Sequence, residues 1–227
     1  MSHIMTSAEF IEKLKYAASK PTVYVLGCFG SPMTDKNKKR YTTNREYNQK
    51  AERADIINAC SSDVFGFDCV CLIKGILWGW NADASMTYGG ASYQSNGVPD
   101  TTITNIIDNY CTDVSEDFTH IVPGEFVVMP EHCGVYIGHN LVIESTPKWA
   151  DGVQVTELWN KQMTSSVGRK WVKHGKLNWI DYSESRKNRI IQVNVSSDVT
   201  SNEINEIKTV LSGMGLEYEV YEVCNEA

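Results

Sequence analysis

The spacing of apolar residues along the chain predicts a protein that mixes helices and strands. Apolar side chains recur at helical intervals over residues 7–19, with Ser7 as the expected N-cap. The next apolar run, residues 22–26, is typical of a strand. Residues 69–80 are apolar on every side, which predicts a buried helix, whereas the polar, turn-rich stretch 30–50 predicts irregular structure.

A three-stranded meander is predicted in the second half of the chain. The strand signals cover residues 125–129, 134–137 and 141–145, and they are separated by Pro130-Glu131 and by Gly138-His139-Asn140. Short strands joined by tight turns pair as antiparallel neighbours, so we expect an α+β fold with a central antiparallel sheet. The remaining expected elements are helices near 46–60 and 102–111, a long ordered loop over 81–101 and a strand over 153–158.

The pattern changes after a polar linker near residue 183. Residues 190–195 and 216–223 are expected to be strands, and residues 201–211 carry apolar side chains at helical spacing between them. This is the order of a small βαβ unit. We therefore predict a main domain over residues 1–183 and a separate module over residues 184–227.

Composition and charge exclude several classes of function. The 21 Lys and Arg residues against 28 Asp and Glu give a net charge of -7, which disfavours binding to nucleic acid. The basic cluster within residues 36–45 is expected to be a solvated stretch, with contact to an anionic polymer as the alternative. No window is apolar enough for membrane insertion, and residues 1–4 are typical of a cloning remnant rather than of a secretory signal.

The seven cysteines are an odd number, so at least one thiol is unpaired. Cys69 differs from the others because it follows Asp68 at the start of the apolar helix, where free N–H groups and the helix dipole stabilise a thiolate. The other six are expected to be small hydrophobic residues. Cys69 and Cys71 resemble half of a zinc site, but no second pair completes it, so we expect no metal.

A nucleophilic thiolate needs a general base, and His132 is the histidine that enters a strand of the predicted meander. His120 and His174 are expected in polar loops. Glu144, a carboxylate inside an apolar strand, is the candidate for orienting the imidazole. The two side chains share a face of the hairpin if the connecting loop has an odd number of residues, as in Gly138-His139-Asn140, whereas a two-residue loop would separate them.

Three segments resemble motifs of the NlpC/p60 family, papain-like cysteine peptidases of the bacterial cell wall. Residues 67–73, Phe-Asp-Cys-Val-Cys-Leu-Ile, look like the family's Asp-Cys-Ser-Gly nucleophile motif. Residues 132–138, His-Cys-Gly-Val-Tyr-Ile-Gly, match its histidine strand, and residues 23–28 resemble the stretch that places a tyrosine beside the nucleophile. The chain departs from the family at Val70-Cys71, at Cys28 and at Glu144, which stands where His, Asn or Gln is usual.

The resemblance implies a papain-like fold in which a nucleophile helix packs on a central antiparallel sheet. It also implies roles for individual residues: Cys69 as nucleophile, His132 as base and then acid, and Glu144 as the group that orients His132. The oxyanion would meet the Cys69 N–H and the Tyr24 hydroxyl. Further candidates for lining the substrate groove are Asp68, Trp78, Lys148 and Trp149, with packing in the core as an equal alternative for each tryptophan. No cofactor is expected.

The function that the resemblance implies is hydrolysis of peptidoglycan stem peptides, between D-glutamate and the following diamino acid, as in endolysins of phages and prophages of Gram-positive bacteria. Such a lysin is made in the host cytoplasm and acts on the wall after release. Two alternatives stay open: an N-acetylmuramoyl-L-alanine amidase on the same fold, and a non-catalytic wall-binding or phage structural protein. The module at 184–227 is expected to bind the wall or to mediate self-association.

Overall fold

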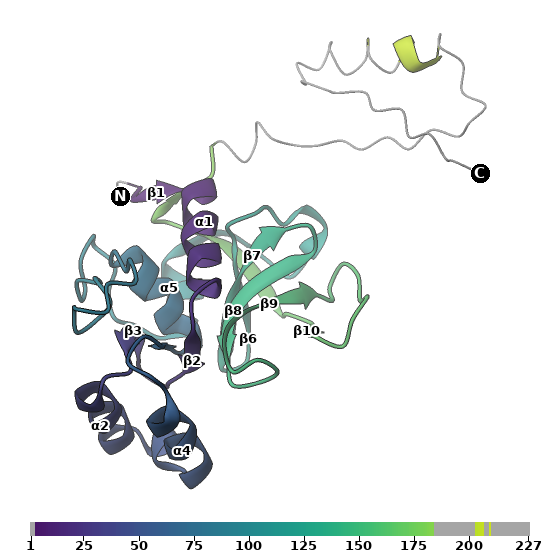
Figure 1. The fold of residues 1–227 in the computed structure, drawn as a ribbon. Coiled ribbons are helices and arrows are strands. Elements are labelled where there is room, and N and C mark those ends of the chain that lie inside the picture. The colour runs from purple at the N-terminus through teal and green to yellow at the C-terminus, as the bar shows by residue number, and fades with distance from the viewer. Residues whose placement is uncertain (1–2, 184–202, 207–208, 210–227) are drawn as a thin grey trace. The chain divides into compact units, whose positions relative to one another are not determined.

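The computed structural model describes residues 3–183, 203–206 and 209, and the chain divides into two compact units, Met1–Lys187 and Asn188–Ala227 (Figure 1). The strands expected at 190–195 and 216–223 lie outside the described residues. Within the helix expected at 201–211, residues 203–206 and 209 are helical. The role of this second unit stays a prediction.

The first unit is α+β, as expected, and is built on a seven-stranded sheet. The sheet is antiparallel except that β10 runs parallel to β9. Its strands, in spatial order, are β10 (Gly168–Arg169), β9 (Gly152–Leu158), β8 (Leu141–Thr146), β7 (His132–Gly138), β6 (Phe126–Met129), β11 (Lys173–Leu177) and β5 (Cys111–Ser115). The expected meander is therefore confirmed as β6, β7 and β8, which are neighbours at the centre of the sheet.

The turn between β7 and β8 differs from the expectation in a way that matters for the site. The loop has two residues, His139 and Asn140, rather than three, because Gly138 already pairs with Leu141. Both loop residues have positive φ, +49° and +63°, the backbone of a tight hairpin turn. A bulge between Tyr136 and Gly138 adds one unpaired residue to β7 and so restores the parity that the short loop would have lost.

Two helices, α1 (Ser7–Ala18) and α5 (Cys69–Leu77), pack against β8, and the apolar residues that they share with the sheet form the main core (Figure 1). The N-cap of α1 is Thr6 rather than the expected Ser7. Thr6 and Glu9 form a reciprocal capping box, which satisfies two backbone N–H groups of the first turn. The buried helix expected over 69–80 is confirmed as α5, although it ends at Leu77.

A smaller sheet leads the chain into α5. It has the order β2 (Thr22–Tyr24), β4 (Phe65–Phe67) and β3 (Phe29–Pro32), with β2 parallel to β4. The expected strand over 22–26 is thus confirmed, but it is shorter. β4 ends at Phe67, immediately before Asp68 and the first residue of α5, so this strand positions the start of the helix.

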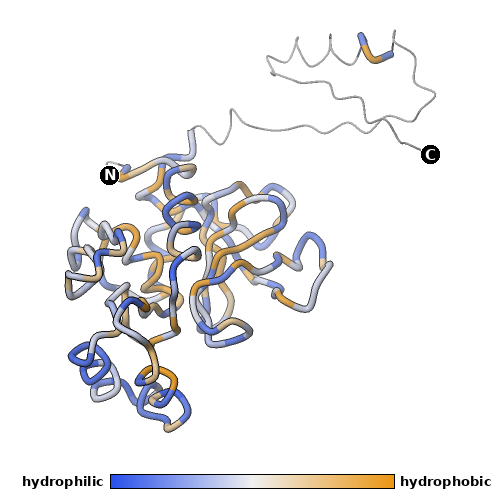
Figure 2. The backbone as a smooth tube through the Cα atoms, viewed as in Figure 1, coloured by the Kyte–Doolittle hydropathy of each residue, from blue (hydrophilic) through white to orange (hydrophobic). Residues whose placement is uncertain are grey.

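Residues 30–60 correct the sequence interpretation. The stretch expected to be irregular contains β3 and a polar helix, α2 (Asp35–Asn44), and the helix expected near 46–60 is broken into α3 (Glu46–Gln49) and α4 (Ala51–Ala59). Figure 2 shows that α2 is hydrophilic along most of its length, in contrast to the sheet and α5. It buries only two of its ten residues, so apolar periodicity gave no signal for it.

The other elements complete the first unit. The loop expected over 81–101 and the helix expected near 102–111 are confirmed, the latter as α6. Within the described part of the chain, no helix is long and apolar enough to cross a membrane. The remaining elements are α6 (Ile103–Asn109), the short 3-10 helix η1 (Phe118–His120), and the parallel pair β1 (Met5–Thr6) and β12 (Ile180–Asp181).

Candidate active site

The first residue of α5 is Cys69, and the carboxylate of Asp68 fixes this helix end. One oxygen of Asp68 accepts a hydrogen bond from the Cys71 N–H at 2.6 Å, and the other accepts from the Gly27 N–H at 2.7 Å. Asp68 is therefore the N-cap, and Cys69 occupies the position where the helix dipole favours negative charge. Asp68 is buried, and burial followed by the charge of Cys69 raises its pKa to about 6.

Cys69 carries the strongest signature of a nucleophile. The largest influence is a hydrogen bond from the Cys133 thiol, which, together with hydrogen bonding and charge from His132, outweighs burial and lowers the pKa of Cys69 to about 5. The sulfur is thus a thiolate at neutral pH, the form in which cysteine attacks. Burial raises the pKa of Cys133 well above its ordinary range, so this second thiol stays protonated and able to donate.

His132 begins β7 and joins Cys69 to a buried carboxylate. Its Nε2 lies 2.5 Å from Oε2 of Glu144, which leaves the other ring nitrogen for Cys69. Burial opposes the charged imidazole, but the hydrogen bonds with Cys69 and Glu144 prevail and raise the pKa of His132. The ring also stacks on Trp171, with centroids 5.6 Å apart and planes 17° apart. Both the tautomer and the orientation of the imidazole are therefore fixed from behind.

Glu144 is fully buried and held by two more side chains, Thr156 and Arg169. The Thr156 hydroxyl donates to Oε1 at 2.6 Å, and the Arg169 guanidinium contacts Oε1 at 3.1 Å and Oε2 at 2.8 Å. Burial alone would favour the protonated acid, but hydrogen bonding and charge from His132, with help from Arg169 and Thr156, lower the pKa of Glu144. A buried carboxylate with these partners stays ionised.

Strand β8, which carries Glu144, packs closely against the segment that leads into α5. Ser145, next to Glu144, donates its hydroxyl to the carbonyl of Phe67, the residue before the helix cap, at 2.9 Å. Gly134 lies in β7 against β8, and a Cβ there would come within 2.7 Å of Val142 Cγ1, 3.0 Å of the Ile143 carbonyl oxygen and 3.3 Å of the Glu144 Cβ. A larger residue at position 134 would displace the carboxylate that holds the histidine.

Of the residues expected to line the groove, Asp68 is the helix cap described above, and Tyr24, Lys148 and Trp149 also lie near this centre. Tyr24 is buried beside Cys69, and burial first, then the charge of Cys69, raises its pKa. Lys148 is exposed and stacks on the half-buried Trp149, with the ammonium 4.6 Å from the ring centroid. The guanidinium of Arg169 lies 4.9 Å from the same ring. Trp149 and Lys148 therefore border the carboxylate end of the site.

Trp78 is a correction, because its side chain lies in the core and not in a groove. It is 1% exposed, and its indole N–H donates to the Val98 carbonyl at 2.8 Å. The ring packs edge-on against Phe29 and Tyr93. Such a satisfied, enclosed indole offers no surface to a substrate.

His174 was expected in a polar loop, and this expectation is wrong. It lies in β11, is 4% exposed and pairs through Nδ1 with the buried Glu125. Its Nε2 lies 3.0 Å from the Asp117 carbonyl, so both ring nitrogens are occupied. The structure thus contains a second buried His–Glu pair that the sequence pattern did not reveal.

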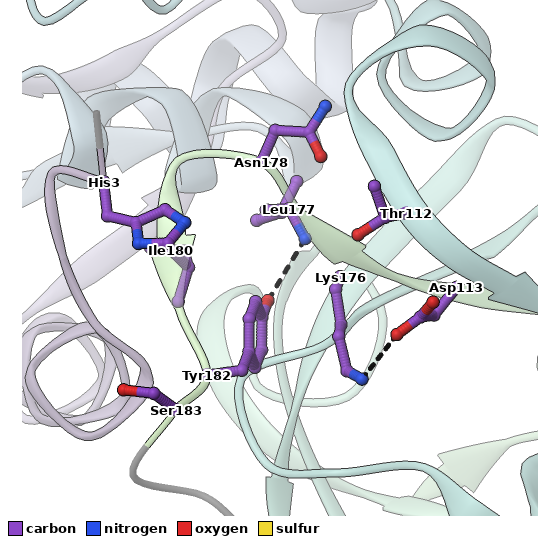
Figure 3. A pocket seen from close by; sticks show the side chains of 9 residues that line it. All are labelled: His3, Thr112, Asp113, Lys176, Leu177, Asn178, Ile180, Tyr182 and Ser183. Carbon is purple, nitrogen blue, oxygen red and sulfur yellow. Dashed lines mark hydrogen bonds and ion pairs between the residues drawn. The ribbon is translucent and has the colours of Figure 1, made fainter. Parts of the chain in front are cut away.

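Two cavities in the described part of the chain are candidates for the substrate site, and they lie at different places. A cavity of about 710 Å³ is bordered by β5, β11 and β12, including Lys176, which pairs with Asp113 at 2.7 Å (Figure 3). A cavity of about 620 Å³ is lined by Asp68, Val70 and Cys71 at the start of α5. The second is lined by the residues on either side of Cys69 in the sequence, so we assign it, rather than the larger cavity, to the surroundings of the site.

Sequence reasoning missed Cys133, Thr156, Arg169 and Trp171. Cys133 stood beside the predicted histidine, and Thr156 lies in a predicted strand, but Arg169 and Trp171 follow a loop that carries no pattern. Over the part of the chain that is described, no three His, Cys, Asp or Glu side chains are grouped as a metal site would require. No protein-family model and no curated protein sequence matches the chain.

Proposed function

We propose that the chain is a thiol hydrolase of bacterial peptidoglycan with the papain-like fold of the NlpC/p60 family. One observation carries this proposal: a thiolate at the start of α5 hydrogen bonds with His132, whose other nitrogen is held by the buried Glu144. Nucleophile, acid–base group and orienting group in this order are the arrangement that peptide-bond hydrolysis by a thiol needs.

The mechanism begins from the ion pair of Cys69 and His132. The thiolate attacks the peptide carbonyl, and the C–N bond breaks as His132 gives its proton to the leaving amine. The neutral imidazole then takes a proton from water, which hydrolyses the thioester and restores the ion pair. The Cys69 N–H, which has no intrahelical partner at the first position of α5, is placed to meet the oxyanion, with the Tyr24 hydroxyl beside it.

The substrate assignment rests on the motifs of residues 23–28, 67–73 and 132–138 and on the border of the site. Trp149 and Lys148 give that border one aromatic face and one cation, which suits a peptide that carries carboxylates. The bond that we propose is the one between D-glutamate and the diamino acid of the stem peptide. The enzyme would be made in the host cytoplasm and reach the wall after release.

Product analysis tests this proposal. Purified walls are digested with the full chain, and mass spectrometry is used to find which amine appears. We expect a new amine on the diamino acid, no product with Cys69→Ala, and normal product with Cys60→Ala, a matched change at a cysteine remote from the site. A new amine on L-alanine would replace the endopeptidase by the amidase, and wall binding without product would replace it by a binding protein.

A further inference from the structure

The cavity at the start of α5 has a chemical character that the hydrolytic machinery does not use. Three cations border it, Arg40, Arg45 and Lys74, together with the phenol rings of Tyr88 and Tyr93. We call it the arginine cavity. Its volume of about 620 Å³ is large enough for an amino-acid residue of a substrate.

The arginine cavity is connected through Gly27 and Asp68 to the start of the helix that carries Cys69. The Gly27 N–H donates to the Asp68 carboxylate, which caps the helix that begins with Cys69. Gly27 has φ +81°, and a Cβ on it would lie 2.6 Å from Nε of Arg45. The absence of a side chain at position 27 therefore lets the Arg45 guanidinium lie directly against the backbone beside the helix cap.

The charges around the cavity do not cancel. Lys74 pairs with Asp100, and the Asp68 carboxylate is taken up by two backbone N–H groups. Arg40 donates to the Tyr88 hydroxyl at 2.7 Å and lies over the Tyr88 ring, with 5.1 Å between the guanidinium carbon and the ring centroid. Within residues 3–183, neither Arg40 nor Arg45 forms an ion pair with a carboxylate.

Helix α2 explains why these two arginines are available. Arg40 lies on this polar helix and Arg45 caps its end, and both are exposed. The basic cluster was expected to be merely solvated, but α2 brings two of its members, Arg40 and Arg45, to the rim of a cavity at the start of α5. A guanidinium is a rigid fork of N–H donors that matches a carboxylate, and the nearby phenol rings offer a flat surface for the attached chain.

We propose that the arginine cavity binds a free carboxylate of the peptide substrate and so selects acidic over amidated stem peptides. This inference rests on the proposed function for the identity of the peptide. In this proposal Arg40 and Arg45 together recognise one property of that peptide, the negative charge of a carboxylate near the cleaved bond.

Binding to the uncleaving variant Cys69→Ala, measured by calorimetry, tests the inference. The two probes are L-Ala-γ-D-Glu-meso-diaminopimelate with free side-group carboxylates, and the same tripeptide amidated at the D-glutamate and diaminopimelate side-group carboxyls. We expect the acid to bind about tenfold more tightly, as charged hydrogen bonds allow. Adding Arg40→Gln and Arg45→Gln should abolish this ratio, whereas Lys36→Gln, elsewhere on α2, should preserve it.

Two outcomes overturn the inference: equal affinity for the two probes, including no binding of either, or an acid preference that survives in the double variant. Thermal unfolding checks that the double variant keeps its fold, which we expect because both arginines are exposed. The proposed function fails separately. Wall cleavage without acid preference ends only the inference, whereas acid preference without any cleavage by the parent chain ends only the proposed function.

Discussion

Two buried His–Glu pairs lie in the same sheet, and they differ in what the second ring nitrogen contacts. In one pair Nε2 of His132 contacts Glu144 and the opposite side of the ring faces Cys69. In the other pair Nδ1 of His174 contacts Glu125, and Nε2 contacts a backbone carbonyl. In both, burial opposes the charged ring and hydrogen bonds to the partners prevail, so the pKa of each histidine is raised.

The comparison teaches that a histidine held by a carboxylate is not by itself a catalytic group. A histidine that transfers protons needs one ring nitrogen that faces a reacting atom. The hydrogen bond at the other nitrogen only orients the ring. His174 has no such nitrogen, so its pair ties β11 to the segment before β6 and serves the fold. His132 keeps one side of its ring for Cys69, and 13% of its side chain is exposed.

The largest expected difference between the two pairs is in activity. His132→Ala should lower kcat for wall hydrolysis by about a thousandfold, because the proton for the leaving amine is lost. The free energy of unfolding in urea should fall by much less than the activation free energy of the reaction rises. The measurement is the rate of product formation per folded molecule. A variant that kept more than a tenth of the parent rate would remove His132 from the mechanism.

The second difference is in stability. His174→Gln should lower the free energy of unfolding by about 3 kcal/mol, because it leaves Glu125 buried without its ionic partner. The rate per folded molecule should stay within a factor of about two.

The stability lost in His174→Gln should depend on pH. A histidine whose folded pKa is raised stabilises the protein fully below its unfolded value, about 6.5, and loses this contribution as the pH rises through the folded value. Urea unfolding should therefore show a larger gap between parent and His174→Gln at pH 6 than at pH 9. A gap that widened toward pH 9 would contradict this account of the pair.

The third expectation concerns the carboxylates. Glu144→Gln should lower kcat by about a hundredfold and move the alkaline limb of the pH–rate profile to lower pH, because the negative charge that raises the pKa of His132 is gone. Glu125→Gln is the matched change in the other pair, and it should leave both limbs in place. If both variants moved the limb equally, the two pairs would not be functionally distinct.

The smallest expected effect belongs to Cys133. Cys133→Ala should move the acid limb, set by Cys69 with its pKa of about 5, to higher pH, because the thiol that donates to the thiolate is removed. The rate at pH 7.5 should fall by about threefold or less. Alkylation by iodoacetamide against pH measures the thiolate directly. Cys111→Ala is the control and should not move the midpoint of alkylation.

The main elements of the site could be predicted because each has a local cause. Cys69 stands at a helix start that the apolar run 69–80 marks clearly, and His132 and Glu144 interrupt strands whose neighbours are apolar. The pairing of His132 with Glu144 was expected from a three-residue loop, whereas the loop has two residues. The two-residue turn would have separated them, and the bulge between Tyr136 and Gly138 brings them back to one face. A bulge leaves no periodic signal, so spacing alone could not reveal it.

The features that could not be predicted depend on contacts across long stretches of sequence. Arg169 contacts Glu144 although it lies 25 positions later in the sequence, after a loop with no periodic hydrophobic pattern. His174 pairs with a residue 49 positions away. Trp78 was placed in the groove because of the family resemblance, but its position as the C-cap of α5 directs its side chain into the core. Helix α2 escaped notice because a helix that buries so little has no apolar face to detect.

The bulge in β7 has a consequence for anyone who redesigns this protein for stability. A routine that idealises strand pairing would delete the extra residue and join β7 to β8 as a regular ladder around the same tight turn. The hairpin would gain a backbone hydrogen bond, but Val142 and Ile143 would leave the apolar clusters in which they are packed. Every residue of β8 would then point the opposite way, with Glu144 turned away from His132. The irregularity of this hairpin is therefore needed both for the packing of β8 and for the contact between His132 and Glu144.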